Sequence, residues 1–207
     1  MTYKTEDLDD PQRFRLFLTI PYTDLVTFVF EYLNKKSLIR LFFWSICIIF
    51  LAFAISIRTR IAGHFPHSNI FLHSLTGLVF LPLACIPLHE FLHVIPYYLS
   101  GAKNIRFGMD LKQYLFYVTA HRHVASPAQF KIVAVVPFLV ISIALLILIL
   151  ILPGLWKWSL SAFLFVHATM CAGDFALLNL YFTNRDKEIY TWDDVDKKEA
   201  YFYEKIE

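Results

Sequence analysis

Residues Leu81 to Leu99 read LPLACIPLHEFLHVIPYYL, an apolar run that carries two histidines and a glutamate near its middle. His89 and His93 are four residues apart, so a helix places both imidazoles on one face, one turn apart. Glu90 directly follows the first histidine. This is the HExxH pattern, in which two imidazoles bind zinc and the glutamate acts as a general base on the attacking water. The alternative is a histidine pair that forms hydrogen bonds across a helical bundle, but the cost of ionisable groups in apolar surroundings favours a metal site.

The composition predicts a mainly α-helical integral membrane protein. Hydrophobic residues make up 57% of the 207 residues, above the roughly 45–50% of soluble domains. A membrane helix needs about 20 apolar residues. Four segments meet this length, at about 37–57, 70–99, 130–152 and 155–182. The expected organisation is an N-terminal cytoplasmic or interfacial segment (1–36), a four-helix membrane domain (37–182) and a solvated cytoplasmic tail, helical at its end (183–207).

Lysine and arginine predict the orientation, because cytoplasmic loops carry an excess of both. Positive residues are frequent before the first segment, in the loop at 100–129 and in the tail, whereas the other two loops contain only Arg58, Arg60 and Lys157. We therefore expect a multi-pass protein of the cell membrane with both termini in the cytoplasm. The polar, acidic N-terminus is not expected to act as a signal peptide. The basic residues form no stripe that would indicate nucleic-acid binding.

Two further patterns predict local structure outside the membrane. The central loop contains NIRFGMDLKQYLFYVTA (104–120), whose aromatic and β-branched residues predict a small β-hairpin. The stretch RFRLFLTI (13–20) alternates similarly and is expected to join that hairpin. Residues 22–34 predict a short interfacial helix.

Asp174 is the predicted third metal ligand, since zinc hydrolases need three protein ligands and one open position. It is the only acidic residue in the last two apolar segments. Both His89 and Asp174 lie 20 residues from the outer end of their segments, counted from position 69 and from Gly154. Each therefore lies about 30 Å deep at 1.5 Å per residue. Gly173 is expected to let the two helices approach closely.

His167 is the competing candidate in the last segment. It lies seven residues before Asp174, about 10 Å of helix rise, which is too far for both to bind one ion. A polar contact within the bundle is the preferred interpretation. Cys47, Cys85 and Cys171 form no CxxC pair and are interpreted as reduced core residues.

These residues resemble a known family. HEFLH in a membrane helix, a β-like loop, AHRHVASPAQFKIVAVVPF (120–138) and a later AGD (172–174) are similar to a bacterial zincin-type membrane-peptidase family classed as a domain of unknown function. The arrangement of these motifs is more distantly similar to that of site-2-type intramembrane metalloproteases, although here the aspartate stands in a Gly173-Asp174-Phe175 context. The resemblance implies a zinc-dependent membrane endopeptidase in which His89, Glu90 and His93 match the first motif and Asp174 matches the acidic ligand.

The sequence thus predicts a zinc metallopeptidase that binds one Zn²⁺ ion through His89, His93 and Asp174. Glu90 is the predicted catalytic base. The expected partners are the lipid bilayer and membrane or membrane-proximal peptide substrates. The alternatives are a non-catalytic membrane protein that binds a metal or a partner, such as a pseudo-protease adaptor, and a transporter. Four helices without inverted repeats make a transporter the weaker alternative.

Overall fold

The computed structural model describes residues 3–110 and 115–206. The helices are α1 (Leu25–Asn34), α2 (Leu38–Ile61), α3 (His67–Leu75), α4 (Leu81–Leu99), α5 (Pro127–Ile151), α6 (Leu155–Met170) and α7 (Ala172–Thr183), with a π-helical turn, η3 (Thr76–Phe80), between α3 and α4. The strands are β1 (Phe14–Pro21), β2 (Ile105–Asp110), β3 (Leu115–Ala120), β4 (Glu188–Asp194) and β5 (Glu199–Lys205), and short 3₁₀ turns are η1 (Thr5–Asp9) and η2 (Tyr22–Asp24). The predicted mainly helical fold with a small β-element is confirmed.

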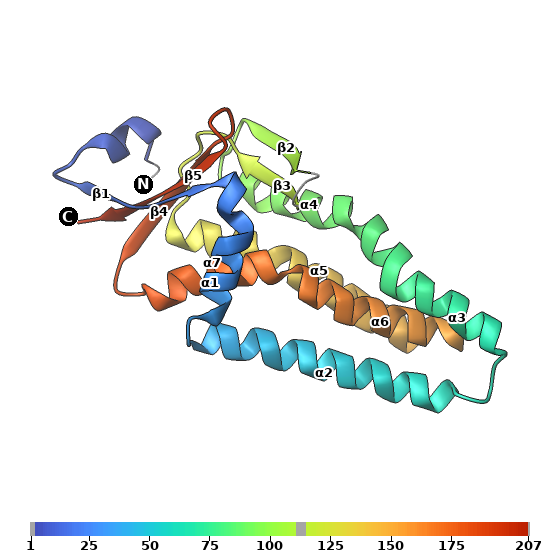
Figure 1. Ribbon diagram of the computed structural model, residues 1–207. Coiled ribbons are helices and arrows are strands. Elements are labelled where there is room, and N and C mark those ends of the chain that lie inside the picture. Colours follow the sequence, from blue (N-terminus) through green and yellow to red (C-terminus); the bar gives the residue numbers. More distant parts are fainter. Residues whose placement is uncertain (1–2, 111–114, 207) are drawn as a thin grey trace.

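The long helices lie side by side, and the strands gather at one end of them (Figure 1). Both ends of the described chain lie beside the strands, while α3 lies at the opposite end. Helix α6 is central and contacts α2, α3 and α5, and its Leu164 and Ala168 are fully buried. Gly77 of η3 lies so close to the Ser159 backbone that a Cβ there would overlap it. Small residues therefore let the helices pack closely at this crossing.

Polar residues mark where the long helices begin. The Ser37 hydroxyl accepts a hydrogen bond from the Arg40 amide at the start of α2. At the start of α5, Ser126 and Gln129 form a reciprocal capping box, and Pro127 occupies the first helical position. Gly154, with a φ of +63°, turns the chain between α5 and α6. These local signals fix the helix ends within a few residues of the bounds that hydropathy predicted.

Three helical stretches of the described residues are long and apolar enough to cross a membrane: Leu38–Ile61, His67–Leu99 and Pro127–Ile151. Helices α6 and α7 pass the same test only as a pair, and they are bent by 44°. Large apolar side chains on these stretches stay exposed, among them Ile48, Leu83 and Ile143. The architecture is therefore compatible with the predicted membrane protein, with three spans or four.

The bend between α6 and α7 corrects the expected continuous helix at 155–182. At Cys171 the backbone has a ψ of 9°, outside the α-helical range, so α7 starts in a new direction. The residues on both sides are equally apolar. Hydropathy therefore gave no sign of the break.

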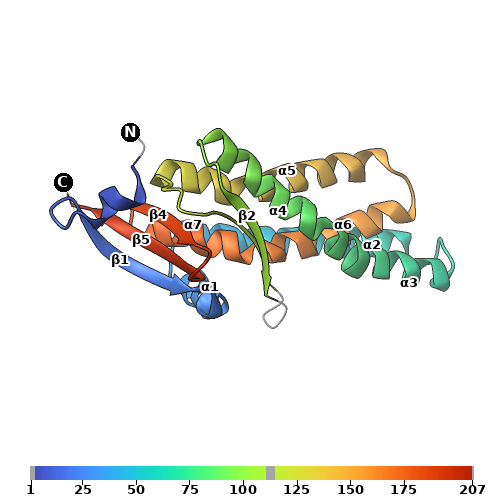
Figure 2. The ribbon, with the colours of Figure 1, turned by 90° about the horizontal axis from the view of Figure 1, so that it is seen from above.

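The central hairpin is confirmed, but the partner predicted for the N-terminal strand was wrong. Strands β2 and β3 pair antiparallel as a separate two-stranded sheet, and β3 contacts α4. Strand β1 instead pairs with β5 in a three-stranded sheet of order β1-β5-β4, which Figure 2 shows at the end opposite α3. The helix predicted at 22–34 is present as η2 followed by α1.

The C-terminal tail also differs from expectation, because it forms strands and is not a solvated extension with a helical end. Strands β4 and β5 pair antiparallel along their whole length. Their Ile189 and Phe202 are almost fully buried and join the main hydrophobic core. Alternating apolar side chains thus hold the tail against the helices.

Asn179 joins three elements and provides a stability prediction. Its side-chain amide donates to the backbone carbonyls of Tyr32 (2.6 Å) and Lys35 (3.1 Å), and its oxygen accepts from the Ser37 hydroxyl. We expect Asn179→Leu to lower the free energy of unfolding by about 2 kcal/mol, because it leaves buried polar groups without partners. Detergent-based thermal or chemical unfolding measures this. Asn69→Leu, at an exposed position of α3, is the control, and an equal loss there would contradict the assigned role.

Candidate metal centre

Helix α4 presents both histidines of the HExxH pattern on one buried face. His89 and His93 are each 8% exposed, and their ring centroids are 5.1 Å apart. The helix packs against α5 and β3, so this face looks into the protein. The four-residue spacing therefore aligns the imidazoles as the sequence predicted.

Helix α7 brings Asp174 to the same place. Its Oδ2 lies 3.3 Å from His89 Nε2, and its Oδ1 lies 3.5 Å from His93 Nε2. Asp174 stands in the first turn of α7, where the helix dipole favours a negative charge. The three residues that the sequence selected as ligands thus meet in the fold, although they come from helices far apart in the chain.

A proline in α5 explains how His93 is oriented. Pro137 has no backbone N–H, so the carbonyl of Val133, four residues earlier, lacks its helical donor. That carbonyl accepts a hydrogen bond of 2.9 Å from His93 Nδ1. Since a carbonyl can only accept, Nδ1 carries the proton and Nε2 keeps a free lone pair. Nε2 is the atom that faces Asp174.

The spacing of these atoms fits a zinc ion. Zinc–nitrogen and zinc–oxygen bonds of 2.0–2.2 Å in a tetrahedron separate neighbouring ligand atoms by about 3.4 Å. The histidine–carboxylate separations, 3.3 Å to Oδ2 and 3.5 Å to Oδ1, each agree with this edge, although they end on different oxygens of Asp174. With one ligand atom per residue, His89, Glu90 and His93 form a group within 4.8 Å. Within the described residues, Asp174 Oδ2 is buried with no polar partner other than the His89 Nε2 that it faces. Two imidazoles and a carboxylate are also a donor set found in catalytic zinc sites.

A cavity of about 370 Å³ opens beside these residues. His89, Glu90, His93 and Asp174 all line it, together with apolar side chains of α1, β3 and α5. Glu90 is partly buried. The site can therefore admit a ligand and bring it into contact with the motif glutamate.

Gly173, next to Asp174, lines this cavity but does not have its predicted packing role. A Cβ there would meet only Val29, at an ordinary distance of 4.0 Å. Close approach of α4 and α7 therefore does not depend on this glycine.

His167 and Cys171 form a second group of possible donors behind the site. The His167 ring centroid lies 5.7 Å from that of His89, and its Nε2 is 3.7 Å from the Cys171 Sγ. Both side chains are fully buried. Neither lines the cavity. The structure thus gives His167 the polar contact within the bundle that the sequence favoured.

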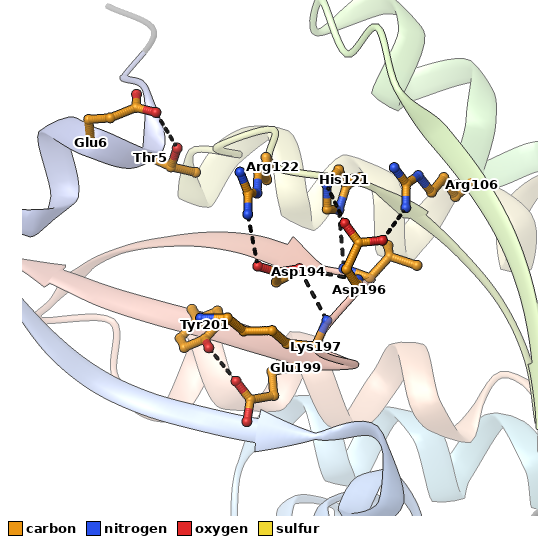
Figure 3. A network of polar contacts seen from close by, with 11 residues as sticks. Thr5, Glu6, Arg106, His121, Arg122, Asp194, Asp196, Lys197, Glu199 and Tyr201 are labelled. Carbon is orange, nitrogen blue, oxygen red and sulfur yellow. Dashed lines mark hydrogen bonds and ion pairs between the residues drawn. The ribbon is translucent and has the colours of Figure 1, made fainter.

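A third group lies outside the helices, where β2–β3 meets β4–β5 (Figure 3). His121 Nε2 is 3.5 Å from Asp196, Arg106 pairs with Asp196 at 2.7 Å, and Arg122 lies 3.4 Å from Asp194. Because arginines already neutralise both carboxylates, this network is an ion-pair contact between the two sheets and not a metal centre.

The opposite wall of the cavity was not predicted from the sequence. Tyr22, Thr191, Asp193 and Phe202 all line it, and they come from the N-terminal segment and the C-terminal hairpin. The alternation in EIYTWDD (188–194) and EAYFYEK (199–205) is a strand signal that could have revealed the hairpin.

Comparison with known proteins agrees with the predicted family. A family model described as "Putative zincin peptidase" matches residues 82–189, more than half of the chain, and this range contains His89, Glu90, His93 and Asp174. No curated protein and no solved structure gave a significant match. Zincins are zinc peptidases, so membership implies a metallopeptidase and its metal. With its motif residues inside the matched range and gathered at one cavity, the chain belongs to this zincin peptidase family.

Proposed function

We propose that the protein is a zinc-dependent, membrane-embedded endopeptidase. In this proposal His89, His93 and Asp174 hold one zinc ion, and Glu90 is the catalytic base. The observation that carries it is the meeting of both Nε2 atoms with one carboxylate at 3.3 and 3.5 Å, on the wall of a cavity that Glu90 also lines.

The metal ligands, Glu90 and the cavity walls have separate roles in peptide hydrolysis. Bound zinc would lower the pKa of a water molecule and polarise the peptide carbonyl. Glu90 then takes a proton from the attacking water and passes it to the leaving nitrogen. The Val133 carbonyl keeps His93 in the tautomer whose Nε2 can bind. The apolar walls of the cavity exclude bulk water and strengthen these interactions.

The alternative donor set, His89 with His167 and Cys171, fits catalysis less well. Its ligand atoms lie within 4.8 Å of one another, as do those of His89, Glu90 and His93. However, a catalytic zinc needs an open position that faces the substrate. His167 and Cys171 are fully buried and do not line the cavity. A zinc ion held by them would be closed off from a peptide.

A location in the membrane is supported by the apolar stretches of the fold. Three spans and the bent α6–α7 pair would form the membrane domain. Both ends of the described chain lie at the end of the helices that carries the sheets. With the lysine and arginine distribution, this supports cytoplasmic termini and a site near the cytoplasmic face. The substrates would then be membrane or membrane-proximal peptides.

Metal removal tests the proposal. Purified protein in detergent should contain one zinc ion per chain by elemental analysis. Chelation should abolish cleavage of a co-purified membrane peptide, and added Zn²⁺ should restore it, because the site's ligands are retained. Cleavage that persists in a sample free of zinc would contradict the proposal. Retained zinc without cleavage of any peptide would favour a non-catalytic adaptor.

A further inference from the structure

A third carboxylate lines the same cavity besides Glu90 and Asp174, and the proposed mechanism does not use it. Asp193 of β4 is partly buried in the cavity wall. Its Oδ1 accepts a hydrogen bond of 3.3 Å from the Tyr22 hydroxyl, and the Tyr22 ring meets Tyr117 of β3 edge to face. A carboxylate is thus fixed in a space that otherwise consists largely of apolar side chains and the proposed centre.

Within residues 3–110 and 115–206, Asp193 has no positive partner. Among the described residues, no lysine, arginine or histidine forms an ion pair or hydrogen bond with its side chain. Its neighbour Asp194 differs, since it accepts from the backbone amides of Asp196 and Lys197 and pairs with Arg122. A carboxylate removed from water without a cation is costly unless a ligand supplies the charge.

The electrostatics agree with this geometry. Burial raises the pKa of the Asp193 carboxyl to about 7, and the hydrogen bond from Tyr22 opposes the rise. A nearby cation would favour the charged form. A positive group that enters the cavity would therefore stabilise the charged form of the Asp193 carboxyl.

Backbone hydrogen bonds fix the positions of Asp193 and Tyr22. The Asp193 carbonyl accepts from the Arg122 amide at 2.9 Å, and the Tyr22 amide donates to the Lys198 carbonyl at 2.9 Å. Tyr22 and Asp193 both lie outside the range that the family model matches, 82–189. The three-stranded sheet, built from the two flanking segments, thus adds a charged group of its own to a cavity that contains the family motif.

We propose that Asp193 and Tyr22 form a substrate-binding subsite that takes up the lysine or arginine side chain of a peptide bound for cleavage. The proposal rests on the proposed peptidase function. It makes the enzyme selective for substrates with a basic residue near the scissile bond. Asp193 supplies the charge, Tyr22 keeps the carboxylate in place, and the apolar wall accommodates the aliphatic part of the side chain.

The test compares short fluorogenic peptides of alanine and leucine that differ only in one lysine, methionine or glutamate, placed in turn on each side of the scissile bond. With zinc-loaded protein, we expect one position at which the lysine peptide has a kcat/KM at least about tenfold above the methionine peptide, because a desolvated charge pair forms there. Asp193→Asn should remove this preference, so that the lysine and methionine peptides are cleaved with equal kcat/KM. Asp196→Asn, an exposed acid on the same hairpin, should keep the preference.

Binding is measured separately in the Glu90→Gln background, so that the subsite and the peptidase function can fail independently. There the lysine peptide should bind more tightly than the methionine peptide, and adding Asp193→Asn should abolish the difference. Equal kcat/KM for lysine and methionine peptides at every position of the wild type would overturn the subsite but not the peptidase. A binding preference without any cleavage would leave the subsite standing and remove the peptidase function. If Asp193→Asn does not fold, the wild-type ratio of kcat/KM between lysine and methionine peptides still tests the subsite. Tyr22→Phe retains the carboxylate and should still prefer the lysine peptide.

Discussion

Glu90→Gln should lower peptide cleavage by about 100- to 10,000-fold, the usual contribution of a positioned general base, while zinc stays bound. Glutamine has almost the same shape as glutamate but cannot accept the proton of the attacking water. Glu90 lines the cavity, and one of its carboxylate oxygens lies within 4.8 Å of ring nitrogens of His89 and His93. In the proposal it acts as the base and not as a ligand, so the zinc content of this variant separates the two roles.

The measurement combines elemental analysis with a cleavage assay on the same preparations. Glu31→Gln, an identical chemical change at an exposed residue of α1 that pairs with Lys35, is the matched control and should retain full activity. Undiminished cleavage by Glu90→Gln would remove Glu90 from the mechanism. Loss of zinc in this variant would show that Glu90 binds the metal instead of acting as the base.

The helices were predictable because apolar composition alone determines them. Ser37, Ser126 and Gly154 stand at or beside three of their ends, and each is a residue type that marks a helix boundary. The break at Cys171 was not predictable by the same argument, because the chain is apolar on both sides of it. It follows from a single backbone torsion, which hydropathy does not report.

The pairing of the strands was harder to predict than their presence. The alternation at 13–20 correctly indicated a strand, but the strand with which it pairs lies far away in the sequence: Phe14 lies opposite Lys205, 191 positions later. The similar alternation at 13–20 and in the central loop favours a pairing of these two stretches. The true partner, β5, instead lies in the tail that was expected to be solvated.

The two walls of the cavity also differ in whether they could be predicted from the sequence. His89 and His93 were predictable from local spacing, and Asp174 from its depth in the last apolar segment. Tyr22 and Asp193 carry no motif. They become part of the cavity only because β1, β5 and β4 form one sheet. When a site combines a motif with residues of distant strands, only the motif residues can be predicted from the sequence.

Asp174→Ala should weaken zinc binding by at least about 100-fold, since even loss of a residue that merely orients a ligand costs 10- to 100-fold. Without the carboxylate, only the two histidines of α4 remain at the proposed centre. Cleavage should fall with the zinc content and should not recover at zinc concentrations that saturate the wild type. Zinc titration against a competing chelator gives the affinity directly.

Cys171→Ala is the matched control for Asp174→Ala, because it removes a donor of the alternative set three residues earlier in the chain. Cys171 contacts His167 at 3.7 Å behind the site, so this variant should bind zinc as the wild type does. Thermal unfolding of both variants without zinc shows whether each is folded. The reverse pattern, with zinc retained in Asp174→Ala and lost in Cys171→Ala, would move the ion to His89, His167 and Cys171. That result would place the metal in a closed site away from the cavity, where it would support the fold rather than hydrolysis.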